Sequence, residues 1–165
     1  MSPLTRTCMP VFFVLSAAVA AAGPRALPSL TLADAAGAAA TEASLTQSSN
    51  WVLLVVDAEK HLTVAVLPRL QRKQEDWAGK LVVVAAGSQA AFERMVAQNA
   101  KLAGARWYRD TTGQLLDRLG LSGTPVLLGM RPDNVIEWQI ATIPEAPEKA
   151  QAVVASWVAR PAPER

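Results

Sequence analysis

Residues 51–70, WVLLVVDAEKHLTVAVLPRL, predict a buried strand that leads directly into a helix. From Trp51 to Val56 the side chains are almost all large and apolar, without the polar alternation of a sheet that has one wet face. We therefore expect this strand to be covered on both faces. Apolar residues then recur at helical spacing, at Leu62, Val66, Leu67 and Leu70.

A polar turn is predicted between this strand and this helix. Asp57 ends the apolar run, and residues 58–61 are polar enough to form a turn. Open α/β sheets bind their ligands at the carboxyl ends of their strands, so a functional site is expected at this turn. Pro68 lies inside the helical pattern, where it removes an amide donor and bends the helix.

The first 22 residues have the pattern of a secretory signal peptide. The apolar run from Val11 to Ala22 is shorter than the roughly 20 residues that a spanning helix needs. It ends in small residues in an A-x-A arrangement, which predicts cleavage after Ala22 or after Ala20 and a periplasmic or secreted protein. The alternative is an uncleaved amino-terminal anchor, and only then do we expect a membrane contact.

The single cysteine, Cys8, lies ahead of the apolar run, so it does not resemble the lipid-modified cysteine of a lipoprotein. Cleavage at Ala22 removes it. A mature chain without a thiol forms no disulfide and no cysteine-ligated metal site.

Composition fits one globular domain, with 165 residues, 51% hydrophobic and 18% charged. The net charge of +2 is small and the basic residues are scattered, so the electrostatic pattern of a nucleic-acid-binding protein is absent.

The rest of the chain predicts alternating strands and helices. Residues 23–29 contain two prolines and are expected to be a linker, and residues 159–165 are expected to be a flexible tail. Before the unit at residues 51–70 we expect two short strands around a D-x-x-G turn at Asp34. After that unit we expect a strand, a helix, a strand, a short helix, a hairpin and a final helix. The predicted ranges are 30–45, 81–86, 88–104 (capped by Ser88), 105–110, 115–119 (closed by Gly120), 126–130 with 135–140, and a helix whose apolar face is Val153, Val154, Trp157 and Val158.

This order of elements, with three motifs, resembles the thioredoxin fold. The motifs are the D-x-x-G turn, the W-x-x-D-x-x-G pattern of Trp107, Asp110 and Gly113, and the G-L-S-G-T-P-V run at residues 120–126. More narrowly they resemble the TlpA and redoxin-type branch that is exported across bacterial membranes. The resemblance covers residues 30–158 and implies an α/β domain with a central mixed sheet, parallel βαβ units plus an antiparallel hairpin, flanked by helices. It also implies that Pro125 is cis, with Thr124 beside it facing the active-site turn.

The chain departs from that family at its defining chemistry, a C-x-x-C at the start of the first crossover helix. Aligning on the helix proline Pro68 puts the two cysteine positions at Lys60 and Thr63, whereas aligning on the end of the strand puts them at His61 and Val64. Neither alignment supplies a sulfur. Dithiol exchange and cysteine-based peroxide reduction are therefore excluded for the mature chain, and we assign no catalytic residue.

The groove that the family uses is still expected, although in a degenerate form. His61, the only histidine, is either a general base beside Thr63, a metal ligand or an exposed turn residue; we favour the last, because a zinc site needs three or four ligands. Asp57 and Glu59 are either paired carboxylates or solvated acids, and we favour the second interpretation. No metal and no cofactor are expected. The candidate groove residues are Asp57, Glu59, Lys60, His61, Thr63, Thr124 and Pro125.

Three hypotheses for the function remain open. In the first, which we prefer, the groove between residues 58–63 and 124–125 holds an extended peptide by strand addition, or contacts a protein partner, in the periplasm. In the second, the protein is an enzyme whose site uses no thiol or is completed by a partner's cysteines. In the third, it is a structural accessory domain with a vestigial groove.

Overall fold

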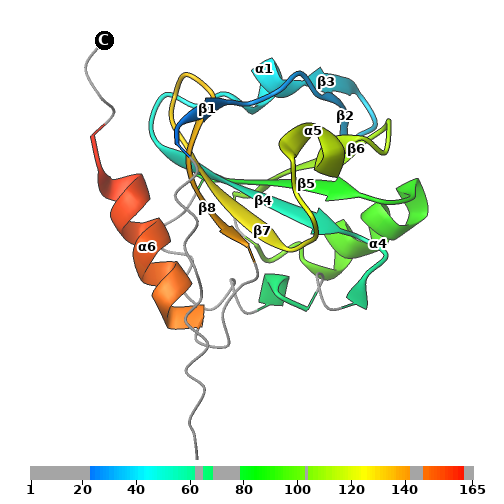
Figure 1. The fold of residues 1–165 in the computed structure, drawn as a ribbon. Coiled ribbons are helices and arrows are strands. Elements are labelled where there is room, and N and C mark those ends of the chain that lie inside the picture. Colours follow the sequence, from blue (N-terminus) through cyan, green and yellow to red (C-terminus); the bar gives the residue numbers. More distant parts are fainter. Residues whose placement is uncertain (1–22, 62–64, 69–78, 103, 142–146, 162–165) are drawn as a thin grey trace, which may run out of the picture.

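A computed structural model shows a single mixed sheet with helices on both faces (Figure 1). It describes residues 23–61, 65–68, 79–102, 104–141 and 147–161. The predicted signal segment, Thr63, Val64, Leu70 and the end of the predicted tail lie outside these residues. Within them the strand order is β1-β8-β7-β4-β5-β6-β2-β3. The strands are β1 (Arg25–Ala26), β2 (Thr31–Asp34), β3 (Ala39–Thr41), β4 (Trp51–Asp57), β5 (Leu81–Ala86), β6 (Arg106–Asp110), β7 (Val126–Met130) and β8 (Val135–Ala141), and the helices are α1 (Glu42–Leu45), α4 (Gln89–Gln98), α5 (Leu115–Leu119) and α6 (Pro147–Ala159).

The central strand β4 is buried on both faces, as predicted. Its alternate side chains enter two separate cores, because successive residues of a strand point to opposite faces. Val52, Leu54 and Val56 pack with side chains of α4 and α6. Trp51, Leu53 and Val55 pack with side chains of α1 and α5 on the other face.

The pairing of the strands confirms the predicted mixture of parallel and antiparallel segments. β5 lies parallel to β4, and β6 lies parallel to β5. β7 runs antiparallel to β4, and β8 returns antiparallel to β7 as the predicted hairpin. The architecture is therefore the predicted thioredoxin-like one.

Two of the recognised motifs form turns that are held by an aspartate. Asp34 Oδ1 accepts hydrogen bonds from the amides of Ala36 and Ala38, both at 2.9 Å, and so closes the turn between β2 and β3. Asp110 is buried, and its Oδ2 accepts the amide of Leu115 at 2.9 Å, at the start of α5. Since the first amides of a helix lack intrahelical partners, Asp110 stabilises this end of α5.

Residues 23–29 are not a linker, and that prediction was wrong. Arg25 and Ala26 form β1 and pair with Ile136 and Val135 of β8. Leu27 is buried, and its amide donates to Asn134 O at 2.8 Å. A strand of two residues has no periodicity to detect, and its stability comes from the neighbouring strand.

The carboxyl-terminal helix differs from the prediction at two positions. Val153 is not part of the buried face, because 42% of its surface is exposed, whereas Val154, Trp157 and Val158 are buried. Ala159, assigned to the tail, is the last residue of α6. Arg160 stays close to the helix, with its guanidinium 6.0 Å from the centre of the Trp157 ring.

The helix α4 begins at the predicted cap but ends earlier than predicted. Ser88 Oγ accepts the amide of Ala91 at 3.4 Å. The helix stops at Gln98, because the side chain of buried Asn99 turns back and donates to Met95 O at 2.8 Å. Among the described residues, no helix is both long enough and apolar enough to span a bilayer.

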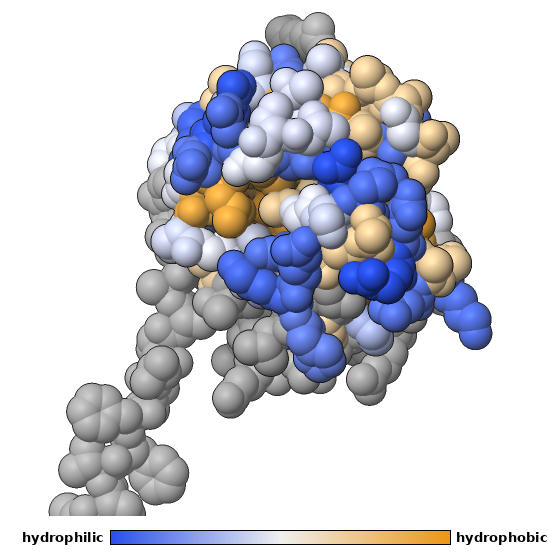
Figure 2. Space-filling view, turned by 90° about the vertical axis from the view of Figure 1, so that its right-hand side faces the viewer, coloured by the Kyte–Doolittle hydropathy of each residue, from blue (hydrophilic) through white to orange (hydrophobic). Residues whose placement is uncertain are grey.

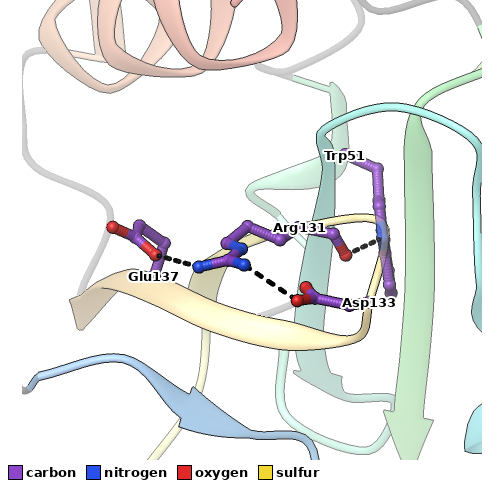
Figure 3. A network of polar contacts seen from close by, with 4 residues as sticks. All are labelled: Trp51, Arg131, Asp133 and Glu137. Carbon is purple, nitrogen blue, oxygen red and sulfur yellow. Dashed lines mark hydrogen bonds and ion pairs between the residues drawn. The ribbon is translucent and has the colours of Figure 1, made fainter. Parts of the chain in front are cut away.

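A polar network fixes the hairpin turn between β7 and β8 (Figure 3). Arg131 pairs with Asp133 at 2.8 Å and lies 3.8 Å from Glu137. The indole nitrogen of Trp51 donates to Arg131 O at 3.1 Å. Because Trp51 begins β4, this bond joins the hairpin to the central strand at the end of the sheet opposite Asp57.

Candidate functional site

The structure brings the two halves of the predicted groove to the same edge of the sheet. β4 ends at Asp57, and β7 begins at Val126, which lies opposite Val55. Extending this antiparallel register places Pro125 and Thr124 across from Val56 and Asp57. The Thr124–Pro125 peptide bond is cis, in agreement with the resemblance.

Asp57 shapes the turn that follows β4. Its Oδ1 accepts the amide of Glu59 at 3.0 Å, and its backbone oxygen accepts the amide of Lys60 at 3.2 Å. Its Oδ2 lies 3.1 Å from the ammonium of Lys60. Asp57 and Lys60 therefore neutralise each other while they close the turn, which is a structural role.

Glu59 fastens the same turn to α4. Its Oε1 accepts the amide of Ser88, the residue that caps α4, at 3.1 Å. Gly87 has a φ of 114°, and a Cβ atom there would lie 3.2 Å from Cγ of Glu59. A side chain at residue 87 would be strained, so this close approach requires glycine. The contacts of Asp57 and Glu59 do not make them a carboxylate pair for acid–base chemistry.

His61 directly follows the turn after β4. Its backbone oxygen accepts the amide of Ala65 at 2.9 Å, and its side chain is exposed. No group of three histidine, cysteine, aspartate or glutamate residues within the described ranges could hold a metal ion. Thr63, the predicted neighbour of His61, lies outside those ranges.

A hollow of about 230 Å³ lies beside Pro125. The loop from α5 to β7 forms one wall, and two side chains of β8 form the other. The lining residues are Gly120, Leu121, Ser122, Gly123, Thr124, Pro125, Val126, Gln139 and Ala141. Thr124 and Pro125 were predicted as groove residues, whereas Asp57, Glu59, Lys60 and His61 do not line this hollow.

The hydroxyl of Thr124, a lining residue, has no hydrogen-bond partner among the described residues. Burying a hydroxyl without a partner is unfavourable. Because this oxygen has almost no accessible surface, it contacts no molecule in the hollow unless the side chain of Thr124 rotates. Sequence reasoning did not find Gln139 and Ala141, because they enter the site only through the pairing of β8 with β7.

The surface at this end of the molecule is mixed in character. Figure 2 views the side toward which β4 and β5 point, and it shows hydrophobic residues in patches surrounded by hydrophilic ones. A surface of this kind can combine apolar contacts with polar recognition, as binding grooves for peptides do.

The fold defined by these elements is a thioredoxin-like fold. No protein-family model matches the chain, and no curated protein matches its sequence. Solved structures do match it. A putative thiol-disulfide oxidoreductase from Bacteroides vulgatus has a TM-score of 0.59 and 23% identity, over 79% of this chain and 88% of that one.

Two further solved structures have a similar fold. A secreted Mycobacterium tuberculosis disulfide oxidoreductase, described as homologous to E. coli DsbE, has a TM-score of 0.56 and 18% identity, over 77% of this chain and 95% of that one. An uncharacterized conserved protein from Geobacillus kaustophilus has a TM-score of 0.63 and 12% identity, over 88% of this chain and 87% of that one. At these identities the similarity establishes the fold, and the activity has to be argued from the site.

Proposed function

We propose that this chain is an exported thioredoxin-fold protein that has lost its redox cysteines and binds an extended segment of a partner protein. The binding edge is the one where β4 ends and β7 begins. The protein acts as a non-catalytic binding or accessory module, and it carries out no thiol–disulfide exchange of its own.

The position of the single cysteine carries this proposal. Cys8 belongs to the segment predicted to be removed on export. The positions that correspond to the family's cysteines are Lys60 and Thr63, or His61 and Val64 in the other alignment. A thiolate is the nucleophile in disulfide exchange, and no other side chain replaces it in that reaction.

The contacts around the turn support binding over catalysis. Asp57 and Lys60 form an ion pair at 3.1 Å, and Glu59 accepts the amide of Ser88. These side chains are used to hold the turn and α4 in place. The hollow beside Pro125 is a concave surface at this edge that another molecule could contact.

Export is supported by the pattern of residues 1–22 and by the nature of the similar structures. The M. tuberculosis protein is described as secreted. An exported chain without cysteines has the further property that it cannot be trapped in mixed disulfides, which suits a binding module in an oxidising compartment.

Affinity capture from periplasmic extract tests the binding role, with the purified chain as bait. Gly123 lines the hollow, and a Cβ atom there meets nothing within 4 Å, so Gly123→Phe adds a bulky side chain to the lining with no clash at Cβ. The matched control is Ala97→Phe on the exposed side of α4. We expect a partner that is recovered by the unaltered chain and by the control and lost with Gly123→Phe. A partner that Gly123→Phe retains would contradict the proposed binding edge, and recovery of no partner would favour a vestigial groove.

Two enzymatic assays test the absence of thiol chemistry. We expect the reduction of insulin disulfides and the consumption of peroxide to stay at background with the purified, signal-cleaved chain. A substantial rate in either assay would mean that another group acts as the nucleophile, and the proposal would then be wrong.

A further inference from the structure

Arg25, which is 100 positions before Pro125 in the sequence, lies at the rim of the hollow beside Pro125. Arg25 belongs to β1, which pairs with β8. Its Nη2 donates to Gln139 Oε1 at 3.2 Å, and its Nη1 lies 3.6 Å from where a Cβ atom of Gly120 would be. Gln139 and Gly120 both line the hollow. The edge strand therefore places a positive charge beside two residues of the hollow, although Arg25 itself is not part of the lining.

This guanidinium has no carboxylate partner among the described residues. The ion pairs within those residues join Lys60 to Asp57, and Arg131 to Asp133 and Glu137. Arg25 carries five N–H donors, and the bond to Gln139 uses one of them. A half-buried arginine with spare donors favours a negatively charged partner, because its planar fork matches a carboxylate.

The walls of the hollow suit the carbon chain of an acidic residue. They include the apolar side chains of Leu121, Val126 and Ala141, which can contact its methylene groups. The volume of about 230 Å³ is below the roughly 300 Å³ at which sites for drug-sized ligands begin, so it fits a side chain better than a cofactor.

We infer that this hollow binds the carboxylate of a glutamate or aspartate side chain in the extended segment that the protein holds. Arg25 donates to the carboxylate from the rim of the hollow, and the apolar wall contacts its carbon chain. This inference rests on the proposed peptide-binding function and adds its specificity: the partner segment carries an acidic residue where it passes Pro125.

An array of extended peptides tests this specificity directly on the unaltered chain. Each peptide is blocked at both ends and made in three versions, with glutamate, glutamine or lysine at its centre. For the sequences that bind, we expect the glutamate version to bind about tenfold more tightly than the glutamine version, and the lysine version to bind more weakly still. Equal binding of the glutamate and glutamine versions would overturn the inference.

Variants then assign the preference to Arg25. We expect Arg25→Gln to remove the preference for glutamate while the glutamine version still binds. Arg160→Gln, which alters an arginine next to Trp157, should leave it unchanged. A preference that survives in Arg25→Gln would also overturn the inference. Binding of peptides without any preference leaves the proposed function standing and rejects the acidic specificity, whereas binding of no peptide rejects both.

Discussion

Gly129 has no side chain because the indole of Trp138 occupies that space. The two residues are opposite each other on β7 and β8, and a Cβ atom at Gly129 would overlap Cε2 and Nε1 of the indole. Trp138 also meets the ring of Trp157 edge-on, with the centroids 6.1 Å apart. The glycine therefore allows Trp138 to lie flat on the sheet and to reach α6.

We expect Gly129→Ala to lower the free energy of unfolding by about 1–3 kcal/mol, the usual cost of overpacking. Urea unfolding followed by tryptophan fluorescence measures it. Gly123→Ala is the matched control, because a Cβ atom at Gly123 meets nothing within 4 Å, and it should change stability by less than about 0.5 kcal/mol. Combining Gly129→Ala with Trp138→Leu should cost less than the sum of the two single changes, and additive costs would contradict the proposed overlap.

Glu42 links stability to pH at the start of α1. Its Oε2 accepts the amide of Leu30 at 2.9 Å, and this bond is the largest cause that holds the pKa of the Glu42 carboxyl below its ordinary value of 4.5. A carboxyl whose pKa is lower in the folded state stabilises the fold fully above its unfolded pKa, and this contribution is lost as the pH falls through the folded pKa. We expect Glu42→Gln to be less stable than the unaltered chain near neutral pH, and the difference to shrink below pH 4.5. Unfolding midpoints across pH measure the difference, and a gap that widens toward acid would contradict this assignment.

At the scale of elements, α6 is held to the sheet by contacts with its last turn. The ammonium of Lys80 donates to Val158 O at 2.8 Å, and the indole of Trp157 donates to Trp51 O at 3.1 Å. The last carbonyl groups of a helix lack intrahelical partners and carry partial negative charge, so a lysine there is favourable. Lys80, just before β5, therefore fixes the carboxyl end of α6.

We expect Lys80→Met to destabilise the protein by about 1 kcal/mol and to raise hydrogen exchange in the last turn of α6 more than in β4. The change keeps the length of the side chain and removes its charge. Lys101→Met, at an exposed position after α4, should have no such effect. Equal exchange in α6 for both variants would show that Lys80 does not hold the helix.

The elements that could be predicted are those whose own sequence carries the signal. β4 and β5 were predicted because a strand buried on both faces is apolar at every position. β1 and α1 were missed because two or four residues show no period, and their contacts come from other parts of the chain. Val153 was wrongly predicted to be buried. The spacing of apolar residues shows that one face of α6 packs on the sheet, but it does not show how wide the buried part of that face is.

For the whole molecule, the sequence could predict which two segments meet at one edge of the sheet but not which residues line the hollow there. The turn after β4 and the residues before β7 were located, since strand ends and the G-L-S-G-T-P-V run are local features. Glu59 reaches Ser88, 29 positions later, and Arg25 reaches Gln139, 114 positions later. Such contacts depend on strand order and register, which no local pattern encodes.

The fold also raises the question of whether cysteines introduced at the two positions of the C-x-x-C motif would give the protein thiol–disulfide exchange activity. The backbone oxygen of His61 accepts the amide of Ala65, four residues later, which is the spacing of a helical hydrogen bond, so a cysteine at residue 60 would stand just before it. Thiols at helix amino termini are acidified. We expect the double change Lys60→Cys and Thr63→Cys, made with Cys8→Ser, to form an intramolecular disulfide and to reduce insulin above background. The pair at His61 and Val64, which the alignment on the end of the strand gives, is tested in the same way.

We expect Asp57 to limit the rate at which the protein with the two introduced cysteines reduces insulin. Replacing Lys60 removes the cation that lies 3.1 Å from the Asp57 carboxylate, and a carboxylate near the new cysteine raises the pKa of its thiol. We therefore expect Asp57→Asn to speed insulin reduction by the grafted protein, and a pH profile of the rate to move toward lower pH, because the thiolate then forms more readily. The single change Lys60→Cys should remain at background, since it cannot release a mixed disulfide. If neither double variant forms an intramolecular disulfide while both stay folded, the correspondence between this turn and the C-x-x-C site of the family is wrong.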